Sequence, residues 1–380
     1  MPSDTPSTAT RARHAAVRLY DDPGPFASVY LDVTRNTEDG EHIVEIRARD
    51  AMDALRAQGA PDSVIDPIRE LLTANTHLAA PVSRMVVASE RGVLLDDVIR
   101  VPISRPTTTW SGLPDLSAWL SDTDAGDFVL ALVDHEGGDV AGFSPVTMQP
   151  HHQSSVGEKS PWEHKIKGGA WNQLNFQRST ETVWGRNADE VVDEIDRQLH
   201  PGVEFVVVGG DQDARSRVLD KLRQHERGGQ VEIVELTEGS READGSEDAI
   251  ITELRQVVAA RSVAHRLAAV HLLRDRLGQG HGATTGVSDT VDALVQGSVE
   301  TLLLDPEALF DPERLSDPDA DEQQIDPARH PGLALGAVRT DGPQRADLVL
   351  LAMALLTQAE PVITRSSTMG GAPVGAVLRW

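Results

Sequence analysis

Cysteine is absent from this sequence of 380 residues, and so is any long apolar run. The lack of cysteine excludes disulfides, thiolate zinc sites and a cysteine nucleophile. Without a stretch of about 18 uncharged apolar residues, no membrane-spanning helix is expected. Residues 1–20 lack the apolar core of a signal peptide, so we expect a cytoplasmic protein. P-loop, dinucleotide-binding and nucleophile-elbow motifs are also missing, so the sequence predicts neither a cofactor nor a metal centre.

Positive charge is scarce, since 35 lysines and arginines stand against 60 acidic residues, a formal net charge of −25. An acidic surface repels phosphate, so the bulk charge alone argues against a nucleic-acid partner. The charge is unevenly distributed, however. From Lys159 to Arg186 five basic residues stand against two acidic ones, whereas residues 305–326 hold nine acidic residues against Arg314. We therefore expect RNA binding by the first of these segments. The overall negative charge has an alternative explanation, namely that an acidic surface keeps the protein soluble.

The length predicts two or three domains, because a domain typically spans about 100–200 residues. Residues 1–125 are expected to form an N-terminal α/β domain that begins with a small, polar and disordered stretch over 1–13. Alternating apolar residues predict strands, and apolar residues at helical spacing predict helices. The strands are expected at 26–33, 84–89, 93–97 and 101, and the helices at 42–58 and 62–74.

Residues 126–238 are expected to form a middle α/β domain. It contains a predicted hairpin of 127–134 with 140–143 and a long irregular loop over 144–182. Loops of this length are often functional or disordered. The same patterns then predict a helix from 187, a strand at 204–209, a helix at 212–225 and a strand at 231–236.

Residues 247–380 are expected to form a C-terminal α/β domain after a polar linker. Its long first helix is expected at 247–277, and further helices at 287–296 and 341–358. Strands are expected at 299–304, 333–339, 361–364 and 374–378. The predicted fold class is therefore α/β, with three α/β domains.

The segment from Lys165 to Arg178 combines features that suit RNA. Lysine and arginine neutralise phosphates, and Trp171 can stack on a base. The pair Gly168-Gly169 permits a close approach of the backbone that other residues forbid. An ordinary flexible loop is the alternative interpretation of the same residues.

Four segments, in this order, resemble the archaeo-eukaryotic class I release factor family. Lys167-Gly168-Gly169, then Gln173 and Phe176-Gln-Arg178, is similar to that family's Gly-Gly-Gln loop. Residues 204–210 resemble the strand ending in glycines that follows it. Residues 291–304 and 369–380 resemble the helix–Gly–strand segment and the Gly-Gly…Leu-Arg-aromatic ending of its last domain. The resemblance spans residues 127–380 and points to the bacterial branch that includes Balon-like ribosome hibernation factors and their actinobacterial relatives. It implies release-factor-like middle and C-terminal domains.

In that family, glutamine directly follows the glycine pair and helps to position the water that attacks the peptidyl-tRNA ester. Here residues 170–172 separate Gly169 from Gln173, and each can span up to about 3.5 Å. Because catalytic geometry tolerates errors of only about 1 Å, we expect a binding factor rather than an enzyme. Residues 1–125 also lack a counterpart of the family's stop-codon-reading motif, so codon-specific termination is not expected.

The resemblance implies that the protein occupies the A site of the 70S ribosome during hibernation and contacts 23S rRNA near the peptidyl-transferase centre. It also implies contact of the third domain with the stalk base or with a translation GTPase such as elongation factor Tu. We expect a monomer away from the ribosome. The residues expected to bind rRNA are Lys159, Lys165, Lys167, Gly168, Gly169, Trp171, Asn172, Gln173 and Arg178.

Two alternatives stay open. In the first, the protein is a peptidyl-tRNA ester hydrolase or release factor that acts on stalled ribosomes through Gln173, with Gly168 and Gly169. In the second, it is a non-ribosomal α/β stress protein.

Three other patterns have a structural explanation. Gly228-Gly229-Gln230 is a literal Gly-Gly-Gln, but it lies between a predicted helix and a predicted strand, where a glycine ends the helix. The histidines of the middle domain's loop, His151, His152 and His164, lack a metal-binding spacing. Residues 317–321 lack the Gly and Glu of a calcium loop. We expect none of the three to be a site.

Overall fold

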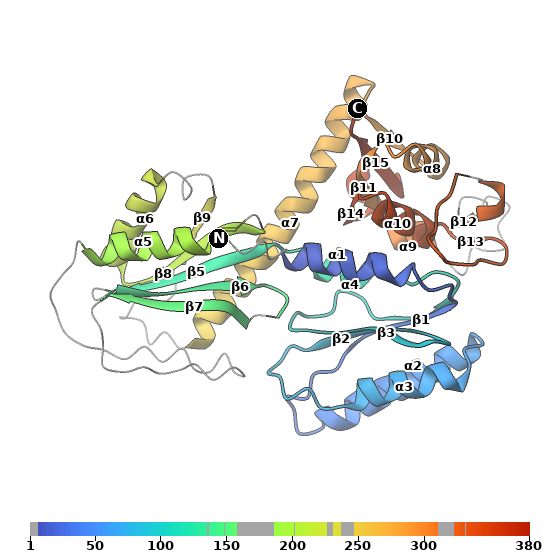
Figure 1. Cartoon of the computed structure of the whole chain (residues 1–380), viewed down its shortest axis with the longest axis horizontal. Coiled ribbons are helices and arrows are strands. Elements are labelled where there is room, and N and C mark those ends of the chain that lie inside the picture. Colours follow the sequence, from blue (N-terminus) through green and yellow to red (C-terminus); the bar gives the residue numbers. More distant parts are fainter. Residues whose placement is uncertain are drawn as a thin grey trace. The chain divides into compact units, whose positions relative to one another are not determined.

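The protein is described by a computed structural model that covers residues 7–134, 137–147, 149–157, 186–200, 202–225, 231–236, 247–310, 323–330 and 332–380. The chain divides into two compact units. Unit 1 holds residues 1–11 and 123–262, and unit 2 holds residues 12–122 and 263–380. Helices and strands mix in both units (Figure 1), which confirms the predicted α/β class. No helix within the covered ranges is long and apolar enough to cross a membrane.

Unit 1 is built on one five-stranded sheet with the strand order β7-β6-β5-β8-β9. The predicted hairpin is β5 (Asp127–Asp134) with β6 (Gly137–Ser144), and β7 (Gln149–Gly157) pairs antiparallel with β6. On the other side, β8 (Val203–Gly210) and β9 (Glu232–Glu235) continue the sheet with parallel pairing.

Helices cover both faces of this sheet. On one face lie α5 (Arg186–Gln198) and α6 (Gln212–Gln224), and on the other lies the N-terminal half of α7 (Glu247–Gln279), as Figure 1 shows. The apolar run Phe205–Val208 of β8 is buried throughout. A strand between two helical layers needs apolar residues on both of its faces, which is why its sequence does not alternate.

The first sheet of unit 2 has the order β3-β2-β1-β4. It consists of β1 (Phe26–Asp32), β2 (Ser83–Ser89), β3 (Gly92–Ile99) and β4 (Thr107–Ser111). One face packs against α2 (Gly40–Ala57) and α3 (Asp62–Thr73) through the apolar positions that predicted these helices. A short helix, α4 (Ser117–Asp122), ends this segment.

The second sheet of unit 2 has the order β10-β15-β11-β14. It consists of β10 (Ala283–Thr285), β15 (Val374–Leu378), β11 (Val299–Leu304) and β14 (Glu360–Ile363). The accompanying helices are α8 (Val287–Val295), α9 (Pro306–Leu309) and α10 (Ala346–Leu356), and a two-residue ladder joins β12 (Gln324–Ile325) to β13 (Gln344–Arg345). The C-terminal half of α7 packs on this sheet through Val270 and Leu273.

Each sheet lies within one of the three predicted domain ranges. Most of the first and third ranges forms unit 2, while residues 1–11 and 247–262 belong to unit 1. The three-domain division with its boundaries stays a prediction.

The disorder predicted over residues 1–13 is wrong from Thr8 onward, because α1 (Thr8–Leu19) is a helix. In unit 1, the Thr8 hydroxyl donates to Asp127 Oδ1 at 2.6 Å. In unit 2, Ala12, Ala16 and Leu19 are buried. These three residues are spaced as on one face of a helix, but the surrounding small polar residues made this pattern too weak to predict the helix.

Three strand predictions also need correction. The strand expected at Val101 is not formed, and β4 instead pairs with the free side of β1. The loop predicted over 144–182 begins with a strand, since β7 occupies 149–157. Residues 333–339 form turns instead of a strand, because Ala337 and Arg339 donate their backbone N–H groups to Tyr20 O and Pro23 O. Partners far away in the sequence decided the backbone conformation of β4 and of residues 333–339, whereas β7 pairs with the adjacent strand β6.

Candidate functional site

All nine residues expected to bind rRNA lie between 158 and 185, outside the described residues. The literal Gly-Gly-Gln at 228–230 is likewise outside them. The structure therefore does not test these roles. What it does describe is the frame from which the segment 158–185 departs, namely β7 before it and α5 after it.

Both ends of this frame lie at one end of the unit 1 sheet. Gly157, the last residue of β7, is paired with Gly137, at the start of β6. A Cβ placed on the next residue, Gly138, would lie 3.1 Å from Cγ2 of Val191, in the second turn of α5. The described residues on either side of 158–185 therefore lie at the same end of the sheet.

This end is also the carboxyl end of the parallel strands β5 and β8. Their last paired residues are Val133 and Gly210. Asp211 follows, donates its backbone N–H to Val133 O at 2.8 Å, and caps α6 by accepting from the backbone of Asp213 and Ala214. Ligand sites of open α/β sheets lie outside the carboxyl ends of their strands. The predicted segment is thus attached where this class of fold places its binding sites.

The glycine that ends β8 is required by the backbone. Gly210 has φ of +111°, and a Cβ there would lie only 2.0 Å from Val133 O. Any other residue would combine a strained dihedral with a backbone overlap. The strand-ending glycines noted in the sequence thus have a structural role in holding β8 against β5.

Acidic side chains lie at this end of the sheet, together with Arg215, which donates to Gly210 O and Leu236 O. Asp134 accepts the backbone N–H of Gly137 at 3.1 Å, and Asp139 accepts the hydroxyl of Ser155. Burial raises the pKa of the Asp139 carboxyl against the opposing effect of Ser155, and the Asp134 carboxylate adds to the rise. Carboxylates repel phosphate, so these acidic side chains do not themselves favour an RNA contact.

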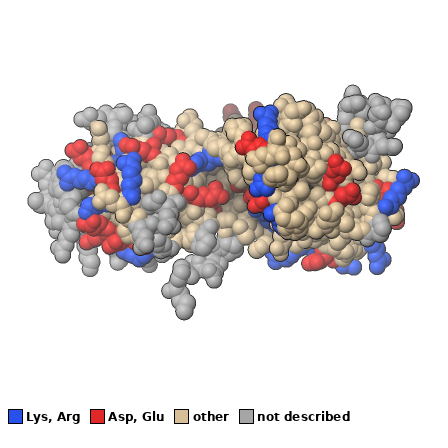
Figure 2. Space-filling view, turned by 90° about the horizontal axis from the view of Figure 1, so that it is seen from above, with Lys and Arg blue, Asp and Glu red and all other residues tan. Residues whose placement is uncertain are grey.

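Charge elsewhere on the described surface is mixed. On the face drawn in Figure 2, acidic and basic side chains are interspersed among the coloured atoms. Several basic side chains of unit 1 are already paired, for example Arg215 with Glu235 at 2.8 Å and Arg261 with Glu232. Within the covered ranges no group of three or more His, Asp or Glu side chains is arranged to hold a metal ion. The excess of basic over acidic residues in 159–186 therefore differs from the mixed charge of the described surface of unit 1.

Sequence reasoning missed Ser155 and Asp139, because it placed Ser155 in the irregular loop 144–182 and Asp139 in the turn of the predicted hairpin. The sequence of β7 carries no alternation that could have indicated them, and only the register with β6 places Asp139 opposite Ser155.

Comparison with known proteins gives a family for this part of the chain. Residues 127–279 match the family described as Bacterial archaeo-eukaryotic release factor family 2. These bounds coincide with the first residue of β5 and the last residue of α7. An uncharacterised protein of Mycobacterium tuberculosis strain H37Rv, Rv2629, is 26% identical over 285 residues, which cover 74% of this chain and 75% of that protein.

Two solved structures show a distant likeness. Pelota of Archaeoglobus fulgidus has a TM-score of 0.37 and 13% identity, and the alignment covers 78% of this chain and 79% of that one. Dom34 of S. cerevisiae, described as a translation termination-like factor involved in RNA quality control pathways and interacting with Hbs1, has a TM-score of 0.36 and 10% identity, with 79% of each chain covered. The family match, which includes the segment 158–185, supports the resemblance expected from the sequence: residues 127–279 are similar to the bacterial archaeo-eukaryotic release factor family.

Proposed function

We propose that this protein is a ribosome-associated factor that binds the A site of the 70S ribosome and reaches the peptidyl-transferase centre with residues 158–185. Its role would be ribosome hibernation without codon-specific termination. The observation that carries the proposal is the family match over 127–279, which contains the Gly-Gly segment and the frame that holds it. The single end of the sheet at which the segment begins and ends supports it, because such a segment can extend away from the fold.

In this proposal the residues have separate tasks. Lys159, Lys165, Lys167 and Arg178 neutralise phosphates of 23S rRNA. Gly168 and Gly169 let the backbone approach the RNA closely, because they carry no Cβ. Trp171 stacks on a base, and the amides of Asn172 and Gln173 supply hydrogen bonds. None of these tasks needs a cofactor.

The partners and the location follow from the same proposal. The protein would work in the cytoplasm, as a monomer until it meets the ribosome. Residues 247–380 would face the stalk base or a translation GTPase such as elongation factor Tu.

Ester hydrolysis is the second candidate function. The observation that favours it is the presence of Gly168, Gly169 and Gln173 within the matched family segment. Against it stand the three residues that separate Gly169 from Gln173 in the sequence. A group that stabilises a transition state typically contributes about 10²–10³ in rate while binding stays nearly intact, so rate and affinity distinguish the two functions.

Co-sedimentation with purified 70S ribosomes tests the proposal directly. We expect the triple variant Lys165→Ala, Lys167→Ala, Arg178→Ala to bind more weakly than the wild type. The slope of log K against log salt is negative, and its magnitude should decrease by about 2–3, because roughly 0.7–0.9 fewer counterions are released for each phosphate contact that is lost.

A second triple variant controls for the change in net charge. Arg49, Arg56 and Arg69 are exposed and pair with acidic residues of their own segment, Asp50, Asp53 and Asp66. Replacing these three by Ala removes the same charge and should leave ribosome binding unchanged. Equal binding of both triple variants and the wild type would refute the proposed contact surface.

A further inference from the structure

Two segments of unit 2 that are far apart in the sequence are joined by backbone hydrogen bonds. Ala337 donates its N–H to Tyr20 O at 2.7 Å, and Arg339 donates to Pro23 O at 3.0 Å. The side chain of Arg13 adds an ion pair to Glu360 at 2.6 Å. Residues 12–122 and 263–380 therefore share a seam, although each segment has its own sheet.

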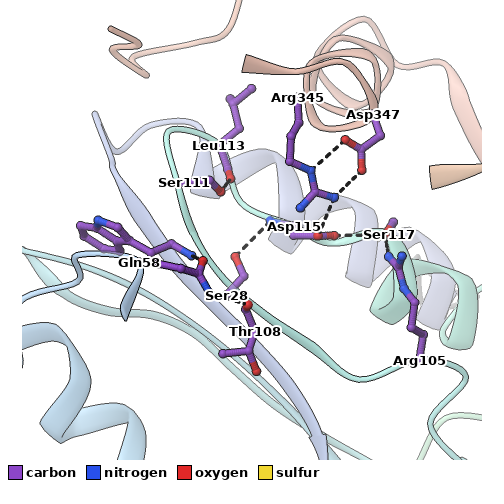
Figure 3. Close-up of polar contacts among 11 residues, drawn as sticks. Ser28, Gln58, Arg105, Thr108, Ser111, Leu113, Asp115, Ser117, Arg345 and Asp347 are labelled. Atoms are coloured by element: carbon purple, nitrogen blue, oxygen red, sulfur yellow. Dashed lines mark hydrogen bonds and ion pairs between the residues drawn. The ribbon is translucent and has the colours of Figure 1, made fainter. Parts of the chain in front are cut away.

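A chain of charged side chains crosses this seam, as Figure 3 shows. On one side, Arg105 donates to the Ser117 hydroxyl at 2.8 Å, and Ser117 donates to Asp115 Oδ1 at 3.1 Å. From the other side, Nη2 of Arg345 lies 3.1 Å from Oδ2 of Asp115. The same nitrogen lies 2.6 Å from Oδ2 of Asp347, and Nε donates to Oδ1 at 3.1 Å. Two cations alternate with two anions along the chain.

The central members of this chain are buried. The side chains of Asp115 and Asp347 are 3% and 0% exposed, and the guanidinium of Arg345 stacks on the ring of Phe310 at 4.3 Å. A buried ion pair is stable only while all its partners are present, and loss of one leaves an uncompensated charge. Asp115 and Asp347 come from different segments, so Arg345 is compensated fully only when the segments are together.

The helix that follows Arg345, α10, also needs both segments to be together. Every residue of α10 from Ala346 to Leu355 is buried. A helix that is apolar all round must be covered all round. Moving one segment away from the other would open the seam at the start of this helix, where Arg345 and Asp347 lie.

We propose that residues 12–122 are a fixed extension of residues 263–380, so that the two segments unfold and refold as one cooperative body with Arg345 as the central connection. Whatever surface residues 263–380 bind, residues 12–122 are carried there with them. The N-terminal segment is thus a positioned part of unit 2 instead of an independently moving arm. This inference does not depend on ribosome binding.

Hydrogen exchange of the full chain in increasing urea, read by mass spectrometry, tests this coupling. In the wild type, peptides from β1 and β2 and peptides from β11 and β15 should lose protection at the same urea concentration. Arg345→Ala should accelerate exchange in both sheets by roughly a hundredfold or more, as expected when a buried pair loses one partner. Exchange in β5 and β8 of unit 1 should stay as in the wild type and serves as the internal reference.

Two further variants sharpen the result. Arg365→Ala removes a guanidinium of the same segment that is 62% exposed and pairs with Glu307, so it should leave both sheets unchanged. Arg345→Lys keeps the charge but loses the planar fork that spans two carboxylates, so its effect should be intermediate. Different urea midpoints for the two sheets in the wild type would overturn the proposal, even if Arg345→Ala does not fold. Acceleration confined to β11 and β15 in Arg345→Ala would also overturn it.

Discussion

Gly210 and Gly92 offer a matched pair of substitutions that isolates the close approach of β8 to β5. Their φ angles are nearly equal, +111° and +113°. A Cβ on Gly92 would meet nothing within 4 Å, whereas a Cβ on Gly210 would lie 2.0 Å from Val133 O and 2.7 Å from Val133 N. Alanine therefore introduces the same dihedral strain at both sites and a backbone overlap at only one of them.

The magnitudes follow from these two contributions. Holding a non-glycine residue in such a region costs about 1–3 kcal/mol, which is the whole effect expected for Gly92→Ala. At position 210 the strands must also separate by more than an ångström, which breaks the hydrogen bond from Asp211 N to Val133 O, 2.8 Å in the wild type. Leaving such a buried group unsatisfied adds about 1–3 kcal/mol. Gly210→Ala should therefore destabilise unit 1 by about 2–6 kcal/mol.

Urea unfolding followed by circular dichroism measures both variants against the wild type, with exchange in β8 and β2 assigning each transition to its unit. Binding to 70S ribosomes provides a second readout, because Gly210 lies at the end of the sheet that holds 158–185 and Gly92 lies in unit 2. We expect Gly210→Ala to weaken binding and Gly92→Ala to leave it intact. Equal destabilisation by the two substitutions would refute the close approach of the strands.

Two other predictions concern single side chains. Tyr20 and Tyr30 are the only tyrosines of the chain, and burial, together with the carboxylates of Asp115 and Asp122 respectively, raises the pKa of both. Because these pKa values lie above the ordinary value of about 10, the stability they contribute is fully present below that pH and is lost above it, by about 1.4 kcal/mol per pH unit for each tyrosine. In an alkaline titration, tyrosinate absorbance should appear only as unit 2 unfolds, and its appearance in a chain with native circular dichroism would contradict this. For the proposed function, Trp171→Ala should weaken 70S binding about tenfold to a hundredfold, while Gln173→Ala should change it little. Robust peptidyl-tRNA hydrolysis that Gln173→Ala abolishes would instead favour the enzyme.

Local patterns predicted much of the fold. The apolar spacing in α2, α3 and α5 and the apolar runs of β1, β5 and β8 are local features, and each element forms close to its predicted bounds. The family resemblance was also predicted from local features, because it depends on short motifs in a fixed order. It agrees with the family match over 127–279. The roles of residues 159–178 rest on chemistry alone and stay predictions.

The errors have a common physical origin. β4, β7 and the turns of 333–339 have no strong pattern of their own. The backbone groups of β4 and of 333–339 are satisfied by partners many residues away, and those of β7 by the adjacent strand β6. α1 was missed for a related reason, since its few apolar residues stabilise the helix only by packing against residues from other parts of the chain. A buried polar group must find a partner, but the sequence does not say which one.

The sequence by itself determined the α/β class, the order of most elements, the basic segment within an acidic chain and the relation to release factors. Tertiary structure decided which segments that are distant in the sequence lie next to one another. It brought Gly157 and the start of α5, which flank 158–185, to the carboxyl end of β5 and β8. It also joined residues 12–122 to residues 263–380 through Asp115, Arg345 and Asp347. Residues 115 and 345 are separated by more of the chain than any local pattern spans, and their attraction becomes strong only after folding removes water from around them.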